Sequence, residues 1–304
     1  MGEYAFFDQL HANAEPFALC QLHGQCVMNL DKSTSATLHY VLVGRGQIEI
    51  AGRKPFDVEP GSLVLIPALR THSLRSFGEL SAHTPECRPA SLDIAGYVHG
   101  DVNVDHDRRL IAICSRMSLS FRNLHRLIDL VREPIVETVD SGSLLAMPLE
   151  TLLHELASPG PGSGAIIRSL LLVCAIDMLR RRLSSNGADL GWMKVLHDPK
   201  LWPALQSMLD DPGETHSLDS LAEAAGMSRS AFAKRFGDAF GCGPMELLRE
   251  LRMQRAAALL VETDAPVKRI ADLSGFRSRS AFSRAFEAAM GFAPQIFRDR
   301  DKVE

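Results

Sequence analysis

An internal repeat in the last third of the chain restricts the possible fold more than any other feature of the sequence. Segments 217–241 and 266–298 align when they are superposed on their turns, although the second turn is one residue longer. The matched pairs include Gly226 with Gly275, Ser228 with Ser278, Phe232 with Phe282 and Phe236 with Phe286. The period of about 50 residues indicates one structural unit built twice.

Each copy of the repeat predicts two short helices joined by a tight turn. In the first copy, Ser217 is placed to cap a helix, Gly226 to supply the turn and Ser228 to cap a second helix. The second copy repeats this order, and residues 244–262 predict a helix between the copies. A helix, a glycine-containing turn and a second helix form the unit that places a recognition helix in the major groove of DNA.

The charge distribution agrees with a DNA-binding surface in the repeats. The formal net charge is −4, which by itself argues against a protein coated for nucleic acid. Residues 217–304 carry 14 Lys/Arg and 12 Asp/Glu, whereas residues 1–216 carry 19 and 25. Basic residues without acids gather in two short segments, 229–235 and 277–284. Such clusters suit phosphate contacts, and two solvated helix faces are the alternative explanation.

The second copy carries a recognisable motif. It consists of Gly275-Phe276, Ser278, Phe282, Arg284, Phe286, Gly291, Pro294 and Phe297-Arg298. This motif resembles the signature of the AraC/XylS family of transcription regulators. The resemblance implies an all-α DNA-binding domain whose two recognition helices enter successive major grooves, roughly 34 Å apart.

By that resemblance, the exposed side of each second helix supplies the DNA contacts. The expected base contacts are Ser230, Ala233, Lys234, Arg279, Ser280, Ser283 and Arg284. Arg279 has the donor geometry to read a guanine edge, whereas Ala233 offers a methyl group alone. We expect Arg229, Arg235 and Arg277 to bind phosphates or to pair within the domain.

The N-terminal third alternates apolar and polar residues in short runs between glycines and prolines, as in an antiparallel barrel or sandwich. The segment HYVLVGRGQIEI, followed by Gly61, Pro67 and His72, resembles the two motifs of the cupin family. Many cupins hold a metal with histidines and a glutamate, but this chain has no His-x-His pair. We therefore expect no metal and no cofactor, with His39 and His72 as pocket or core residues.

Two further groups are candidates for sensing an effector. Arg70 lies at one end of a predicted strand, where it would bind an anionic effector or remain a surface charge. Among the six cysteines, Cys87 stands beside Arg88 between prolines, which favours an exposed thiolate. The chain also resembles the reactive-chlorine-responsive branch of the regulator family. That resemblance implies oxidant sensing by Cys20 and Cys87, with Cys26 competing for the first place.

Residues 106–212 predict helices that connect the two ends of the chain. The expected helices cover residues 118–133, 141–157, 165–183 and 197–211, with a break or kink at Pro148. Cys114 and Cys174 fall in apolar runs that we interpret as helical packing positions. The very apolar segment 165–183 requires burial against its own domain or against a second subunit.

We therefore predict an α+β protein with three parts: a cupin-like β-barrel sensor at 1–105, a helical connector and dimerisation region at 106–212, and an AraC-type DNA-binding domain at 213–304. The expected function is sequence-specific transcription regulation in response to a small molecule or an oxidant, as activator or repressor. An alternative is a cupin enzyme fused to a DNA-binding domain. Expected partners are double-stranded DNA, RNA polymerase and a second copy of the chain. The sequence predicts a cytoplasmic protein with no membrane partner, because it has no secretory signal and no long apolar run.

Overall fold

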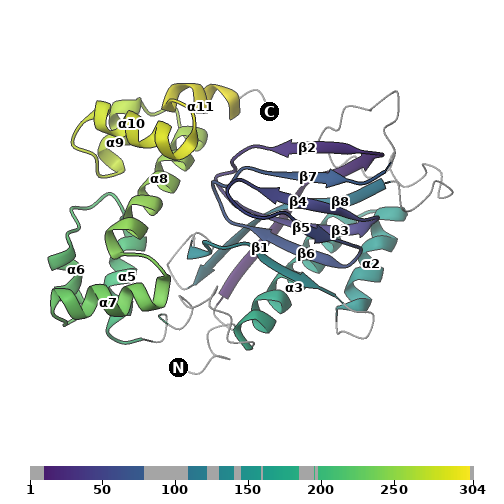
Figure 1. Ribbon diagram of the computed structural model, residues 1–304, viewed down its shortest axis with the longest axis horizontal. Helices are drawn as coiled ribbons and strands as arrows, with labels where there is room; N and C mark the ends of the chain where they lie inside the picture. Colours follow the sequence, from purple (N-terminus) through teal and green to yellow (C-terminus); the bar gives the residue numbers. More distant parts are fainter. Residues whose placement is uncertain are drawn as a thin grey trace. The chain divides into compact units, whose positions relative to one another are not determined.

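A computed structural model describes residues 10–78, 109–121, 130–139, 145–158, 160–184, 195 and 198–301 (Figure 1). Contacts divide the chain into two compact units. One contains His11–Leu119 and Val131–Gly187, and the other contains Met1–Leu10, Ser120–Leu130 and Ala188–Glu304. Among the described helices, none is both long and apolar enough to cross a membrane.

The N-terminal unit contains two β-sheets. The larger has the strand order β1-β8-β3-β6-β9, and the smaller has the order β2-β7-β4-β5. The strands are β1 (Leu10–His23), β2 (Cys26–Leu30), β3 (Ala36–Val43), β4 (Gly46–Ile50), β5 (Phe56–Val58), β6 (Ser62–Ile66), β7 (His72–Ser76), β8 (Arg109–Phe121) and β9 (Ile135–Thr138). Antiparallel pairing places Cys114 of β8 opposite His39 of β3.

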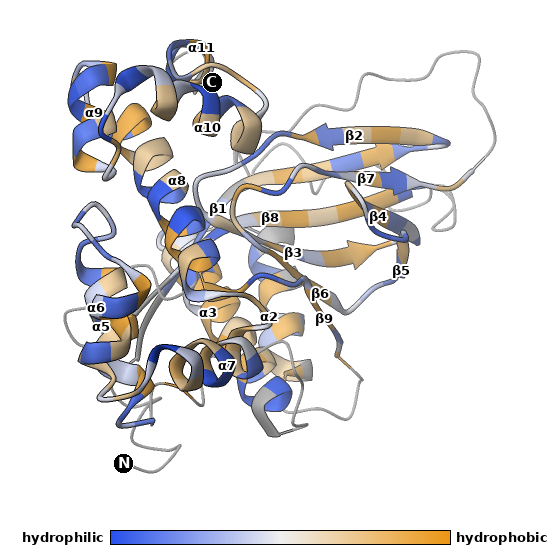
Figure 2. Ribbon diagram, turned by 60° about the vertical axis from the view of Figure 1, so that its left-hand side comes forward, coloured by the Kyte–Doolittle hydropathy of each residue, from blue (hydrophilic) through white to orange (hydrophobic). Residues whose placement is uncertain are grey.

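The space between the sheets is filled by side chains from both of them. The hydrophobic cluster draws its members from β1 through β8, and Figure 2 shows hydrophobic residues along β3 and β8. Three cysteines, Cys20, Cys26 and Cys114, belong to this cluster. The cluster is the core that fixes the positions of the strands, because each member loses its contact with water there.

Two helices follow the strands in this unit. They are α2 (Ala146–Ala157) and α3 (Ser163–Ser184), and Figure 1 shows them side by side. Pro148 lies in the first turn of α2, where its missing N–H leaves no helical hydrogen bond unmade. Arg182 of α3 lies 3.4 Å from Glu137 of β9, so α3 also contacts an edge of the larger sheet.

The helix expected at 118–133 is wrong in its first residues, because β8 continues through Phe121. Cys114 accordingly lies on a strand, although its predicted burial is confirmed. Within β8, Leu110, Ala112 and Cys114 point to the core at the strand period of two. A short apolar run does not by itself distinguish a buried strand from a helix. Both β8 and β9 lie beyond residue 105, in the part of the chain that the sequence predicted to be helical. At its other end, residues 131–133 are not helical either, because the chain there leads into β9, and residues 122–129 lie outside the described residues.

The C-terminal unit is helical, and the repeat is present in its structure. The helices are α5 (Leu201–Asp210), α6 (Leu218–Ala224), α7 (Arg229–Phe240), α8 (Pro244–Glu262), α9 (Val267–Leu273), α10 (Arg279–Met290) and α11 (Pro294–Asp301). Helix α8 joins α6 and α7 at one end to α9 and α10 at the other (Figure 1). The predicted caps are confirmed: Ser217, Ser228 and Ser278 accept hydrogen bonds from backbone N–H groups of α6, α7 and α10.

The segment after α5 ties the two halves of this unit together. Arg252 of α8 donates hydrogen bonds to the carbonyls of Pro212, at 2.7 Å, and Glu214, at 2.8 Å. A Cβ on Gly213 would stand 2.1 Å from the carbonyl oxygen of Leu273, so only glycine permits this approach. The segment is therefore wedged between α8 and the turn that precedes α10.

Candidate DNA interface

Helix α7 exposes one face because its other face fills the core. Phe232, Phe236 and Phe240 recur at four-residue spacing and are buried. On the remaining surface, Ser230 and Lys234 are exposed and Ala233 is half-buried. The predicted reading face of the first unit is thus accessible, and Lys234 is its long charged side chain.

Helix α10 repeats this arrangement with different side chains. Phe282, Phe286 and Met290 are buried. The candidate contacts Arg279, Ser280 and Arg284 are exposed, and Ser283 is half-buried. The second face therefore offers two guanidinium groups, which donate hydrogen bonds in a planar fork suited to guanine edges and phosphates.

The ion pairs divide the basic candidates into two groups. Within residues 198–301, no ion pair engages Lys234, Arg277, Arg279 or Arg284, and all four are exposed. Arg229 and Arg235, by contrast, each have a carboxylate partner. Unpaired exposed cations are the groups that exchange counterions for DNA phosphates most readily.

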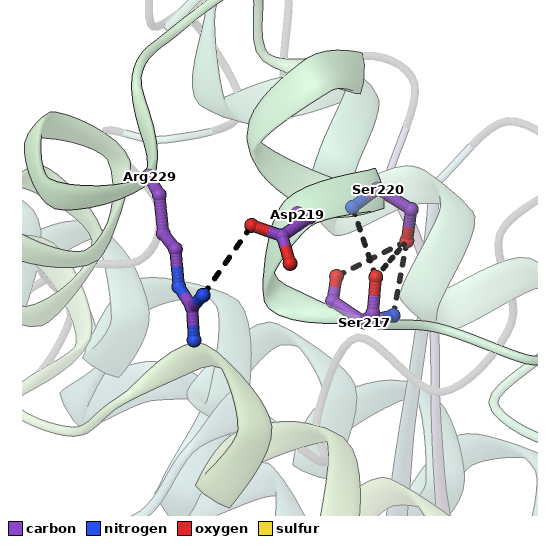
Figure 3. Close-up of polar contacts among 4 residues, drawn as sticks. All are labelled: Ser217, Asp219, Ser220 and Arg229. Carbon is purple, nitrogen blue, oxygen red and sulfur yellow. Dashed lines mark hydrogen bonds and ion pairs between the residues drawn. The ribbon is translucent and has the colours of Figure 1, made fainter.

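The two paired arginines differ in how tightly they are held. Arg229 lies 3.6 Å from Asp219 of α6, and both side chains are mostly exposed (Figure 3). Arg235 donates two hydrogen bonds to Oδ2 of Asp198, from Nε at 2.9 Å and from an Nη atom at 2.7 Å. Of the two roles that the sequence left open for Arg235, the structure supports pairing within the domain.

The first helices of the two units carry opposite charges. Figure 3 shows the cap of α6, where Ser217 and Ser220 exchange hydrogen bonds beside Asp219. The positions that align with Asp219 and Ser220 are Lys268 and Arg269 of α9, and both are exposed. The first helix of such a unit crosses the DNA backbone, so these two cations are candidate phosphate contacts that the sequence analysis missed. Aligning the charges of the first helices would have identified them.

The interior of the N-terminal unit contains a chain of hydrogen bonds that includes both candidate histidines. The Nδ1 atom of His72 lies 3.3 Å from the carbonyl of Arg70, the two Nε2 atoms of His39 and His72 lie 2.7 Å apart, and Nδ1 of His39 lies 3.2 Å from Sγ of Cys114. A carbonyl only accepts, so Nδ1 of His72 carries a proton and its Nε2 accepts from His39. Nδ1 of His39 then accepts from the Cys114 thiol.

Burial keeps the members of this chain neutral. It lowers the pKa of His72 to about 4, against a hydrogen bond to Arg70 that raises it. Burial and the neighbouring His72 lower the pKa of His39 well below its ordinary value. Burial and a hydrogen bond with Cys20 raise the pKa of the Cys114 thiol. The structure thus brings His39, His72 and Cys20 together in the core, not in an open pocket.

The other sensor candidates are spread over the unit. Arg70 is exposed, and its charge helps to lower the pKa of the partly buried Lys32, after the larger effect of burial. Cys26 lies in the hydrophobic cluster and is disulfide-bonded, whereas Cys20 is a free thiol. Cys87 lies outside the described residues. The part of the chain that the structure describes contains no group of three potential metal ligands.

Comparison with known proteins assigns each half of the chain to a domain family. Residues 5–184 match the cupin family model, and residues 221–300 match a helix-turn-helix domain model. A cupin domain and a helix-turn-helix domain in one chain define a DNA-binding transcription regulator. The chain belongs to the AraC-type regulators that carry an N-terminal cupin domain.

Several relatives extend over most of the chain. It is 26% identical over 265 residues to RclR of Escherichia coli (strain K12), an RCS-specific HTH-type transcriptional activator, which covers 86% of this chain and 84% of the relative. A putative AraC-like transcription regulator of Streptomyces lividans is 28% identical and covers 90% of each chain. The DNA-binding domain of AdpA, solved in complex with a target DNA, is 30% identical over 34% of this chain and 94% of that chain, with a TM-score of 0.33.

Proposed function

We propose that α7 and α10 read an operator through the exposed residues on the side of each helix opposite its buried phenylalanines. Ser230, Ala233 and Lys234 contact bases from α7, and Arg279, Ser280, Ser283 and Arg284 contact bases from α10. Arg277, Lys268 and Arg269 bind phosphates, with Arg229 at the margin of the first face. The observation that carries this assignment is the set of exposed basic side chains without an ion-pair partner in residues 198–301.

The test of base reading is Arg279→Ala. An operator is first obtained by selection from random duplexes, and binding is then measured to that operator and to an unrelated duplex. Loss of a guanine contact weakens operator binding by about 1–3 kcal/mol and leaves the unrelated duplex nearly unaffected. Equal losses on both duplexes would make Arg279 a phosphate contact.

We propose that the cupin unit senses an oxidant through a thiol pair. Two of the candidate cysteines, Cys20 and Cys26, lie in the hydrophobic cluster between the sheets, where a change in their bonding would act directly on the packing of the strands. Cys20 is fully buried and hydrogen-bonded to Cys114, whereas Cys26 is disulfide-bonded. These observations favour Cys26 over Cys20 as the first member of the pair, with Cys87 as the second on the grounds of its sequence context. The RCS-specific relative agrees with an oxidant signal.

Hypochlorous acid converts a thiolate to a sulfenyl chloride with release of hydroxide. The second thiol then displaces chloride and loses a proton as the disulfide forms. The fully reduced protein should therefore change its operator affinity after one equivalent of hypochlorous acid. Cys26→Ser and Cys87→Ser should abolish the change, whereas Cys20→Ser should preserve it. The opposite pattern would return the role to Cys20.

We propose that the protein acts as a homodimer, in the cytoplasm with its DNA, and that RNA polymerase is a further partner. Helices α2 and α3 present exposed apolar side chains, among them Met147, Ile166 and Val173. Large apolar groups in one region of a surface suit an interface between copies. We propose no catalytic role, because the ring nitrogens of His39 and His72 are occupied by one another, by Cys114 and by the Arg70 carbonyl.

A further inference from the structure

Arg235 lies on α7, next in sequence to Lys234 of the reading face. Both of its hydrogen bonds go to a single oxygen of Asp198, which lies before the start of α5. The arginine side chain is 50% exposed and the aspartate side chain 15%. The guanidinium group is thus within reach of solvent, while its partner is mostly enclosed.

Asp198 is held in place by its own backbone contacts. Its Oδ1 atom accepts hydrogen bonds from the N–H groups of Lys200, at 2.9 Å, and Leu201, at 3.2 Å. Its carbonyl accepts from the N–H of Trp202 at 2.9 Å. Burial opposes the charge of Asp198, but the bonds from Arg235 and from the two N–H groups outweigh it and lower the pKa. The carboxylate is fixed and ionised, so the arginine is the partner that is free to leave.

The helix-turn-helix fold does not require this pair. The position that aligns with Arg235 in the second unit is Ala285, which folds with the same buried phenylalanines. The other acid–base pair of the first unit, Asp219 with Arg229, is open at 3.6 Å and largely solvated. Asp198 therefore neutralises Arg235, a cation beside the first reading face. The second unit has no cation at the equivalent position.

Helix α5 determines where Asp198 stands. At the far end of α5, Asp211 lies 3.1 Å from Arg255 of α8, and the next residues carry the hydrogen bonds from Arg252. The helix is thus fastened to α8 at one end and to α7 at the other. Because α5 buries Leu201, Ala204, Leu205 and Met208, a shift confined to its first turn is the displacement that would withdraw the carboxylate from Arg235 with the least disturbance of the core.

We propose that Arg235 is a phosphate contact held in reserve by Asp198. While α5 is seated, the carboxylate neutralises the guanidinium; once α5 shifts, Arg235 binds a phosphate on the wall of the groove that α7 enters. The exchange adds one phosphate contact, which releases one more counterion from the DNA. This inference rests on the proposed DNA interface, since it requires α7 to enter a groove.

The test is a double-mutant cycle of full-length chains: wild type, Asp198→Asn, Arg235→Gln and the double variant. Operator affinity is measured over a series of salt concentrations. Asparagine retains an Oδ1 atom that can accept the hydrogen bonds from the N–H groups of Lys200 and Leu201, and it loses the charge. Asp198→Asn should steepen the slope of log K against log [salt] by about 0.9 and tighten binding on the order of ten-fold near 0.1 M salt. Arg235→Gln should leave the wild-type slope unchanged and remove the gain in the double variant.

Two results would overturn the proposal. One is a salt slope in Asp198→Asn that equals the wild-type slope. The other is a salt slope in Arg235→Gln that is shallower than the wild-type slope, which would make Arg235 an ordinary phosphate contact. Asp219→Asn is the matched control, and its slope should equal that of the wild type because Arg229 is already nearly free. Circular dichroism and urea unfolding of each variant verify that α5 and its unit remain folded. A wrong DNA interface would be recognised by a different result: wild type and Arg284→Ala would then bind the operator equally.

Discussion

The two helix-turn-helix units share a core and differ in their surfaces. In both, phenylalanines at matching positions are buried and serine caps the reading helix. In the first unit, carboxylates pair with two of the three basic residues that the sequence marked out. In the second unit, Arg277, Arg279 and Arg284 have no such partner within residues 266–301.

This difference shows that packing and charge are specified independently in a repeated unit. The buried positions must keep their volume and shape, so they stay alike in the two copies. Exposed positions carry no such restriction, and a change of charge there costs little stability. The described second unit therefore offers three exposed arginines without an ion-pair partner, whereas the first offers Lys234 and two paired arginines.

The largest expected effects concern the shared core. Phe236→Ala and Phe286→Ala each remove a fully buried ring that packs against two others. Each change should lower the free energy of unfolding of the C-terminal unit by about 3–5 kcal/mol. Hydrogen exchange of peptides from α8 in the full-length chain measures this. A cost at one site less than half of that at the other would contradict the equivalence of the two cores.

The next effects concern the reading faces. Arg284→Ala should weaken operator binding by about 1–3 kcal/mol, because a guanidinium binds a base edge or phosphate through two directed bonds. Lys234→Ala removes the aligned residue of the first unit, which acts as a point charge, and should cost less than half as much. Fluorescence anisotropy on one operator compares the two. A larger loss for Lys234→Ala would reverse the proposed ranking of the units.

The elements that local patterns specify were predictable from the sequence. The repeat, the serine caps and the buried phenylalanines each depend on residues a few positions apart, where helical period and capping chemistry act directly. The strand β8 was not distinguished from a helix, because a short apolar run fits both periods. Its neighbours in the sheet, which decide between them, come from distant parts of the sequence.

The details of the site depend on contacts between distant residues, and these were not predictable. Asp198 and Arg235 are separated by 37 positions, and nothing near Arg235 indicates that its charge is already paired. The hydrogen bond between His39 and His72 joins the two sheets, so it follows from how the sheets pack and not from either strand alone. The sequence restricted each residue to a small set of roles, and tertiary packing selected among them.

A smaller effect concerns the charges on the first helices. Lys268→Ala with Arg269→Ala should reduce the steepness of the salt dependence by about 1.8, or 0.9 for each lost phosphate contact. The loss should be similar on the operator and on an unrelated duplex, because phosphates carry no sequence information directly. The control is Asp219→Ala at the aligned position of the first unit, for which the slope should not change. An unaltered slope in the double variant would place α9 away from the backbone.

The smallest expected effect is the contribution of the Asp198–Arg235 pair to stability. Half-exposed ion pairs contribute about 1 kcal/mol or less, so Asp198→Asn should cost no more than this at neutral pH. The hydrogen bonds to Asp198 hold its pKa below the ordinary value of 3.8, so the folded state binds its proton less readily than the unfolded state. The contribution is therefore complete above about pH 5 and declines as the pH falls through the lowered pKa of the carboxyl group. The difference in unfolding free energy between wild type and Asp198→Asn should be flat from about pH 5 to pH 8 and should shrink below about pH 4, whereas Asp219→Asn should differ little from wild type throughout. If the unfolding free energy of the wild type instead rose relative to that of Asp198→Asn as the pH fell, the ionised carboxylate would destabilise the fold. The role of the pair would then be its control of Arg235 alone.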